Sequence, residues 1–101
     1  MSVIYSQQEN GQFDFDYYLT KHMPLVANLY KDLGMQSWQV DRGASLSSKT
    51  PSNIVACAYL FFDSIDALKS ALKSKGGEVM KDVKNFTNIE PDVYFSEVIE
   101  S

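Results

Sequence analysis

Cysteine and histidine are almost absent from this sequence of 101 residues, which contains one of each. The single cysteine, Cys57, excludes a disulfide within the chain and a zinc site built from several cysteines. Because His22 is the single histidine, any catalytic arrangement that needs an imidazole depends on it. The sequence also lacks a glycine-rich phosphate loop and an HExxH pattern, so we expect no metal and no cofactor.

Basic residues are scarce as well: 9 Lys and Arg face 13 Asp and Glu, and the net charge is -4. A chain without excess positive charge is poorly suited to a phosphate backbone, so we expect no nucleic-acid partner. The uncharged run Ile54 to Phe62 is far shorter than the ~20 residues of a membrane-spanning helix. The segment Met1 to Ser6 lacks the basic and apolar regions of a secretion signal. We therefore expect a cytoplasmic protein without membrane contact.

What is present is an ordinary globular composition, with 45% hydrophobic and 22% charged residues. The length fits one compact domain, residues 1–101. Four segments rich in β-branched or aromatic residues predict strands: Ser2 to Gln7, Gln36 to Arg42, Ile54 to Phe62 and Asp92 to Ile99.

Two helical regions separate these strands. The first begins near Phe15 after the N-cap residue Asp14, is kinked or divided at Pro24 and ends at Gly34. Its buried stripe is predicted to contain Phe15, Tyr18, Leu19 and His22. The second helix follows the capping segment Asp63 to Asp66 and is predicted to end at Gly76-Gly77, before a short extra helix containing Val79, Val83 and Phe86.

The order β-α-β-β-α-β predicts an α+β, ferredoxin-like domain, with four antiparallel strands and both helices on one face of the sheet. The other face would then expose large apolar side chains unless a partner covered it. A second copy of the chain meets this need, so we expect a homodimer whose paired sheets enclose a small apolar pocket.

The segment Phe13 to Val26, FDFDYYLTKHMPLV, resembles the signature of the EthD family. The matching positions are Phe15, Tyr18, His22, Pro24 and Leu25, and Asn85-Phe86-Thr87 before the last strand is a further similarity. This resemblance implies the dimeric α+β barrel shared by muconolactone isomerases, methylmuconolactone methylisomerase, quinone-forming monooxygenases and small haem-degrading enzymes. Some EthD-like proteins accompany alkyl ether breakdown, and others act in aromatic polyketide and lactone pathways. This sequence differs from the isomerases in having no second histidine.

His22 is the leading candidate for a general acid or base, since it exchanges a proton near neutral pH and belongs to the buried stripe. Tyr18 is the candidate that polarises a substrate oxygen. The alternative is a structural histidine whose ring bonds backbone carbonyls at the Pro24 kink.

Candidate ligand-binding side chains lie on the predicted strands, and the strand register decides which of them share a face. Aromatic rings with one polar atom suit a flat ligand, although they equally fill a barrel. Cys57 would pack inertly unless it points into the pocket beside His22. These candidates are Tyr5, Trp38, Cys57, Tyr59 and Tyr94.

Two further features are open to a functional and a plain interpretation. Arg42 either holds a substrate carboxylate or is an exposed residue at a strand end. The loop from Gly43 to Asn53 is either a lid over the pocket or an idle connection.

Three functions remain open from the sequence. The first is a cofactor-independent enzyme that moves a proton next to the carbonyl of a small hydrophobic compound, such as an enol-lactone or an aromatic polyketide. The second is a non-catalytic accessory protein that binds a small apolar molecule. The third is a cofactor-free or haem-linked oxygenase, with Trp38 in the cavity and His22 as the iron ligand.

Overall fold

A computed structural model describes residues 1–45 and 52–100. Within these residues, no helix has the length and apolar character needed to span a membrane. The strands are β1 (Ser2–Ser6), β2 (Met35–Arg42), β3 (Ile54–Phe62) and β4 (Asp92–Tyr94). The helical elements are α1 (Phe15–Tyr17), the π-helical turn η1 (Tyr18–His22), α2 (Met23–Tyr30), η2 (Lys31–Leu33), α3 (Ile65–Asp82) and η3 (Val83–Asn85).

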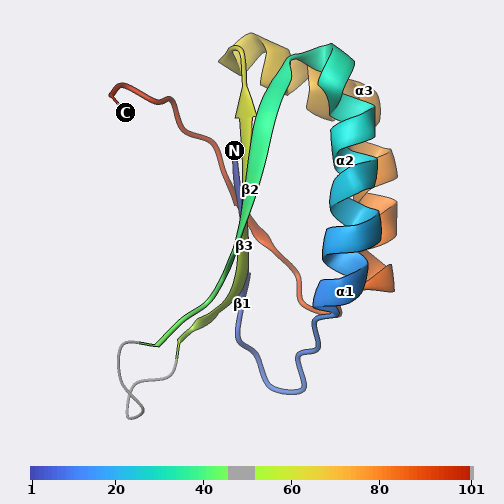
Figure 1. Ribbon diagram of the computed structural model, residues 1–101, viewed down its shortest axis with the longest axis vertical. Coiled ribbons are helices and arrows are strands. Elements are labelled where there is room, and N and C mark those ends of the chain that lie inside the picture. Colours follow the sequence, from blue (N-terminus) through green and yellow to red (C-terminus); the bar gives the residue numbers. More distant parts are fainter. Residues whose placement is uncertain (46–51, 101) are drawn as a thin grey trace.

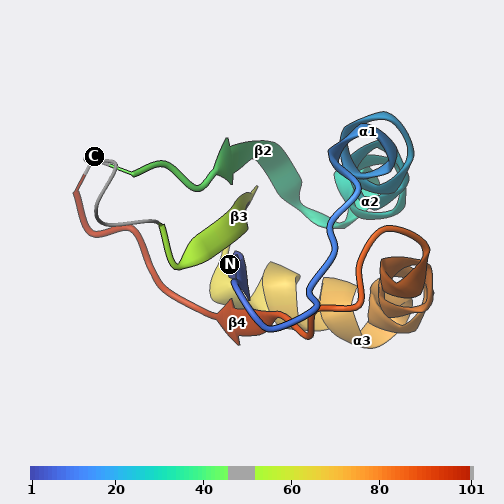
Figure 2. The same ribbon diagram turned by 90° about the horizontal axis from the view of Figure 1, so that it is seen from below.

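The four strands form one antiparallel sheet in the order β2-β3-β1-β4. Figures 1 and 2 show that α1, α2 and α3 all lie on the same side of this sheet. The predicted α+β, ferredoxin-like arrangement is therefore confirmed.

The first helical region is continuous but contains one wider turn. Asp14 caps its start by accepting a hydrogen bond from the Tyr17 amide at 3.0 Å, as predicted. In the turn η1 the Met23 amide donates to the Tyr18 carbonyl, five residues earlier, and Pro24, which has no N–H, follows at once. Leu19 is 45% exposed, so the prediction that it belongs to the buried stripe was wrong.

The second helix is longer than predicted. Ser64 caps it by accepting from the Ala67 amide at 3.0 Å, but α3 then runs through Gly76 and Gly77 to Asp82 without a break. Glycine in a helix interior costs only about 1 kcal/mol relative to alanine, and the packing of α3 outweighs this cost. The prediction of a helix end at Gly76-Gly77 was wrong.

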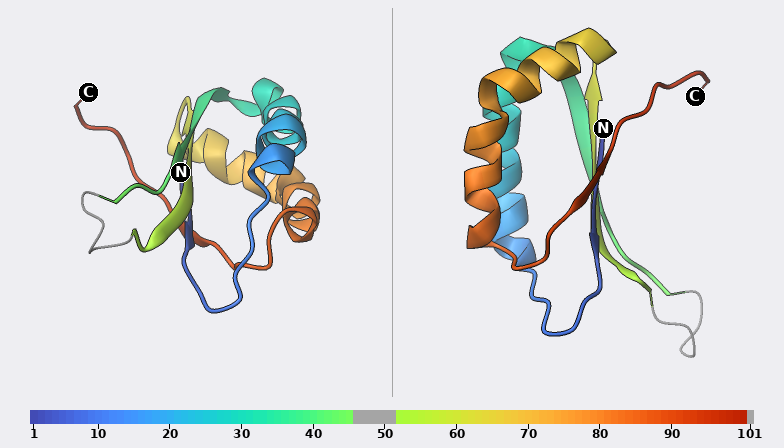
Figure 3. Two further views of the ribbon diagram at one scale, coloured as in Figure 1. Left: turned by 60° about the horizontal axis from the view of Figure 1, so that its bottom comes forward. Right: turned by 180° about the vertical axis from the view of Figure 1, so that it is seen from behind.

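The last strand is shorter than the predicted range Asp92 to Ile99. Tyr94 lies opposite Ser2, where β1 begins, so residues beyond Tyr94 have no β1 residue to pair with. The following segment, 95–100, turns away from the helix side of the sheet (Figure 3) and exposes Phe95, Val98 and Ile99. We call residues 95–100 the C-terminal segment.

The two faces of the sheet follow from the strand register, because side chains alternate along each strand. Ala58 pairs with Val3 and Val40, and these residues share the face under the helices. Cys57 pairs with Ile4 and belongs to the opposite face, which we call the bare face. Large side chains of the bare face are Tyr59, Phe61 and Tyr94.

Candidate functional site

A cavity of about 160 Å³ lies between the helix-covered face of the sheet and the helices. The small side chain of Ala58 on β3 lies at its floor, where a larger residue would fill the space. The cavity walls come from all layers of the fold and are mainly apolar: Met1, Val3, Tyr5, Tyr18, His22, Met23, Val26, Tyr30, Ala58, Leu60, Leu72, Gly76, Val79, Met80, Val83, Pro91 and Val93. The pocket predicted from the sequence lies between two paired sheets, whereas this cavity lies within one chain.

His22 is held in the cavity wall by a carboxylate that lies 60 residues further along the chain. The Nδ1 atom of His22 is 2.8 Å from Oδ2 of Asp82, the last residue of α3. The side chains are 5% and 14% exposed, so solvent screens this contact only weakly. Because an ionised carboxylate only accepts hydrogen bonds, Nδ1 carries the proton and Nε2 keeps its lone pair.

Two further side chains hold Asp82 in position. The Tyr17 hydroxyl donates to Oδ1 of Asp82 at 2.7 Å, and the Asn85 side-chain amide donates to the same oxygen at 2.9 Å. Tyr17 lies one residue before η1, and Asn85 is three residues beyond Asp82. The cluster therefore joins the start of the first helical region to the end of α3.

The pKa shifts favour a neutral His22 beside an ionised Asp82. Burial lowers the pKa of His22 below its ordinary value of 6.5 and outweighs the opposing effect of Asp82. Burial alone would raise the pKa of Asp82, but hydrogen bonds from Tyr17, Asn85 and His22 hold it below its ordinary value of 3.8. At neutral pH the imidazole is thus a base with a free nitrogen, held by a negative charge.

Nε2 of His22 opens into the cavity. It forms no hydrogen bond within the described chain. Every described side-chain nitrogen or oxygen that is buried from solvent has a hydrogen-bond partner. Because Nε2 has no such partner, it is not buried from solvent. Since His22 lines the cavity, this is the space that Nε2 reaches.

Three tyrosine hydroxyls add the other polar groups of the cavity. Tyr5, Tyr18 and Tyr30 are buried and line it, and their hydroxyls form no hydrogen bond with a described residue. Every described side-chain oxygen that is buried from solvent has a hydrogen-bond partner, so these unpartnered hydroxyls reach open space. Burial raises the pKa of each, so the hydroxyls stay protonated and can donate to a ligand oxygen.

Aromatic rings fix the orientation of His22. Its ring stacks on Tyr18 with a centroid distance of 5.3 Å and an interplanar angle of 16°, and it contacts Phe86 at 4.5 Å. Tyr18 also packs against Tyr5 in a T-shaped contact at 6.0 Å. Tyr18 and His22 are four residues apart in η1 and therefore lie on the same face of the first helical region.

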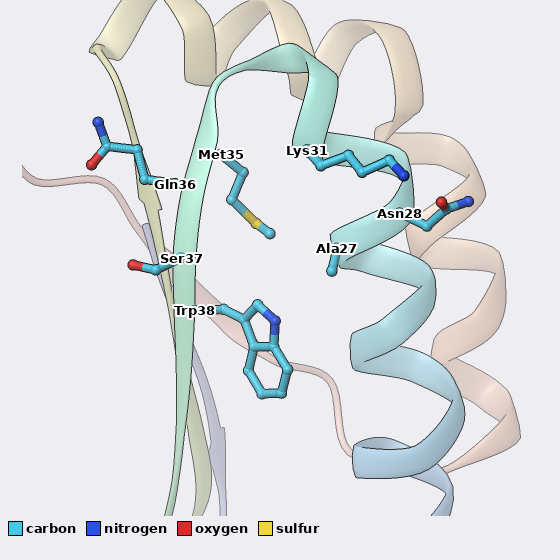
Figure 4. A pocket seen from close by; sticks show the side chains of 7 residues that line it. All are labelled: Ala27, Asn28, Lys31, Met35, Gln36, Ser37 and Trp38. Carbon is cyan, nitrogen blue, oxygen red and sulfur yellow. The ribbon is translucent and has the colours of Figure 1, made fainter.

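The structure brings together three of the seven predicted site residues, Tyr5, Tyr18 and His22. Trp38 lies on the helix-covered face but outside this cavity, in a surface hollow between α2 and β2. Figure 4 shows the Trp38 and Met35 side chains pointing toward α2, while Gln36 and Ser37 point away from it. The complete lining of the hollow is Ala27, Asn28, Lys31, Met35, Gln36, Ser37 and Trp38.

The remaining predicted site residues, Cys57, Tyr59 and Tyr94, lie on the bare face and not beside His22. Cys57 is buried, which fits the packing interpretation.

The two further features of the sequence lie away from the cavity or outside the description. Arg42 is an exposed residue at the end of β2, one of its two interpretations, and its guanidinium lies over the Phe15 ring at 4.3 Å in a cation–π contact. Residues 46–51 of the loop from Gly43 to Asn53, interpreted either as a lid or as an idle connection, lie outside the described residues.

Asp82 is the member of the candidate site that the sequence did not predict. It follows Val79 by three residues and precedes Phe86 by four, so it lies on the same stripe of α3 and η3 as these apolar side chains. An acidic residue on an apolar stripe was the available signal. In the described part of the chain, no three His, Cys, Asp or Glu side chains gather as a metal site would require.

Comparisons with known proteins identify the family. The sequence profile of the EthD domain matches residues 9–90. An EthD-like protein from Ralstonia eutropha JMP134 is 31% identical, with a TM-score of 0.88 over 98% of this chain and 89% of that chain. No curated protein matches the sequence significantly.

Two more distant solved structures share the fold. An ethyl tert-butyl ether D (EthD) family protein from Bacillus halodurans C-125 is 21% identical, with a TM-score of 0.59 over 93% of this chain and 95% of that chain. HapK from Hahella chejuensis is 12% identical, with a TM-score of 0.51 over 99% of this chain and 97% of that chain. On the evidence of the profile match and the Ralstonia structure, this chain belongs to the EthD domain family.

Proposed function

We propose that the cavity is the site of a cofactor-independent proton transfer on a small hydrophobic carbonyl compound, with His22 as the general base. The observation that carries this proposal is the His22–Asp82 pair, which leaves the lone pair of Nε2 facing an apolar cavity. A base of this kind contributes typically 10²- to 10⁴-fold to the rate of a proton transfer.

The reaction follows from the protonation states. Nε2 of His22 takes a proton from the carbon next to the carbonyl, and the electron pair of that C–H bond forms an enolate. A hydroxyl of Tyr18 or Tyr5 donates a hydrogen bond to the oxygen that gains negative charge. Asp82 stabilises the imidazolium, which then returns the proton to the same or to another carbon, so the net reaction is exchange or isomerisation.

The second candidate is an accessory protein that holds the same compound without converting it. The apolar walls favour it, because they supply binding without any catalytic group. A haem-linked oxygenase fits less well, since a cavity of about 160 Å³ has the size for a single ring and not for a tetrapyrrole.

We further propose that the protein works as a homodimer that associates through the bare face. Tyr59 and Phe61 give this face an apolar surface, and Phe61 is 39% exposed. The C-terminal segment supplies Val98 to a groove that Tyr59 and Phe61 also line. A second sheet packed on this surface would remove it from water.

Proton transfer is tested with α-angelica lactone, a small enol-lactone, and with acetophenone. Nuclear magnetic resonance in deuterium oxide follows double-bond migration in the lactone and deuterium uptake next to the ketone. The wild-type protein should accelerate at least one of these reactions, and His22→Gln should lose roughly 10²-fold or more of that rate. Lys21→Gln, an exposed neighbour in the same turn, is the control and should retain the rate.

Two outcomes would contradict the proposal. If both probes bind and the wild-type protein converts neither, the accessory function is favoured. If His22→Gln remains folded and retains the full rate, His22 is not the base. Circular dichroism and thermal unfolding of each variant separate a loss of chemistry from a loss of fold.

A further inference from the structure

The polar groups of the cavity are all formally uncharged at neutral pH apart from Met1. They are the neutral imidazole of His22 and the hydroxyls of Tyr5, Tyr18 and Tyr30. Met1 also lines the cavity, but its amino group donates to the Leu60 carbonyl oxygen at 2.9 Å. No Lys, Arg, Asp or Glu side chain belongs to the lining, as far as the structure describes it. A ligand carboxylate or phosphate would therefore lose its hydration without gaining a cationic side chain.

The volume of the cavity limits the ligand to about one ring. An apolar cavity of ~150 Å³ in another protein holds one benzene molecule. The present cavity, about 160 Å³, is of the same size, and its tyrosine hydroxyls add donors for one oxygen function. Ring and oxygen together define an uncharged, monocyclic carbonyl or hydroxyl compound.

Gly76 occupies the position on α3 where the cavity would otherwise be filled. The helix presents Leu72, Val79 and Val83 to the cavity, and Gly76 lies between them on the same stripe. A Cβ atom at Gly76 would meet the Leu72 Cβ at 3.9 Å, an ordinary contact, and no other atom within 4 Å. No backbone strain requires this glycine, so its effect is the space that it leaves.

The mouth of the cavity lies beside Gly76. Met80 on α3 and Val93 on β4 both line the cavity, and they are 56% and 41% exposed. These partly exposed residues of α3 and β4 mark where the cavity reaches the surface. An added side chain at Gly76 would thus narrow the space that joins the mouth to His22.

We propose that the cavity selects an uncharged, single-ring compound with one oxygen function, and that Gly76 sets the size limit of this compound. The proposal rests on the proposed function in placing the ligand beside His22, but it concerns binding and not conversion. The space that Gly76 leaves for a ligand explains why α3 contains a glycine that costs about 1 kcal/mol of helix stability relative to alanine.

The chain offers a matched control for Gly76. The neighbouring Gly77 lies in the same helix and is exposed, and a Cβ atom added there would meet no other atom within 4 Å. Alanine at either position should raise the melting temperature by up to about 4 °C, because both changes improve helix propensity. Only Gly76→Ala places a methyl group in the cavity.

Three ligands separate charge from size: acetophenone, benzoate and 2-acetylnaphthalene. Calorimetry and ligand-dependent thermal stabilisation should show binding of acetophenone and at least tenfold weaker binding of benzoate, which matches it in shape but carries a charge. The two-ring ketone should also bind at least tenfold more weakly. Gly76→Ala should weaken acetophenone binding by about tenfold or more, as one methyl group does in a hydrophobic pocket, while Gly77→Ala leaves it unchanged.

Each contrary result overturns a defined part of the proposal. Equal binding of benzoate and acetophenone removes the selection for neutral ligands. If Gly76→Ala and Gly77→Ala bind acetophenone equally well, Gly76 does not set the size limit. If acetophenone, phenol and cyclohexanone all fail to bind at millimolar concentration, the cavity is not a single-ring site. If acetophenone binds as expected and no proton exchange occurs, the proposed catalysis fails while the binding inference stands.

Discussion

The two faces of the sheet use similar apolar side chains in opposite ways. Under the helices, β3 presents the small side chains of Ala56 and Ala58, and the space above Ala58 is a cavity that contains a histidine. On the bare face, the alternating positions of the same strand present Tyr59 and Phe61, which form a surface. One strand therefore separates a small enclosed site from a broad apolar patch. Because the cavity and the apolar surface lie on opposite faces of the sheet, substitutions should change ligand binding and dimer association separately.

The largest expected effect concerns the bare face. Phe61→Asp puts a charge into the surface that we assign to the dimer, and should weaken association by about a thousandfold, the effect of losing a central aromatic contact. Analytical ultracentrifugation over a range of concentrations measures the change. Ser70→Asp adds the same charge at an exposed position of α3 and should leave the dimer intact.

The same variant sharpens the contrast between the faces. Because all lining residues of the cavity come from one chain, the Phe61→Asp monomer should still bind acetophenone. A wild-type protein that sediments as a monomer at high concentration would contradict the assignment of the bare face.

An intermediate effect is expected for the pair behind the cavity. Asp82→Asn removes the charge that holds the Nδ1 proton of His22 and should lower the rate of proton transfer roughly 10²-fold. Since Asp82 raises the pKa of His22, the acid limb of the pH–rate profile should also move to lower pH. Glu78→Gln removes an exposed carboxylate from the same helix and should change neither quantity. An unshifted acid limb would reduce Asp82 to a structural residue.

The smallest effect is on stability as a function of pH. The pKa of His22 is lower in the folded protein than its ordinary 6.5, so the unfolded chain binds more protons just below that pH. The free energy of unfolding should therefore fall as the pH drops below 6.5, and Asp82 should add a further loss below 3.8. Urea unfolding between pH 8 and pH 4 measures the first part. His22→Gln should flatten this dependence of the free energy of unfolding on pH. If the dependence is unchanged in His22→Gln, His22 is not a buried neutral imidazole.

Local signals in the sequence predicted most of the fold. Ile54–Phe62 is the strand that its apolar run indicated, and Asp14 and Ser64 cap the helices that follow them. Gly34 adopts the left-handed conformation, with φ of 102°, at the end of the first helical region. Each of these features depends on residues close in sequence, which is why they were predictable.

The errors and omissions depend on contacts between distant residues. α3 continues through Gly76-Gly77 because it packs on the sheet, and β4 ends at Tyr94 because β1 offers no further partner. The division of the candidate residues between two faces depended on register, which one sequence does not determine. Asp82 meets His22 across 60 residues, so the periodicity of neither segment revealed the pair. The homodimer and the cytoplasmic location stay predictions.

The wider turn η1 makes the length of the first helical region a determinant of what faces the cavity. An α-helix rotates by about 100° per residue, so a chain with one residue fewer between Asp14 and Pro24 would close η1 into a regular turn and rotate its two flanks relative to each other. Residues before and after η1 would then point in different directions relative to each other, although every strand remained in place. Insertions and deletions at this point would therefore distinguish relatives that retain the histidine in the cavity from relatives that retain only the scaffold.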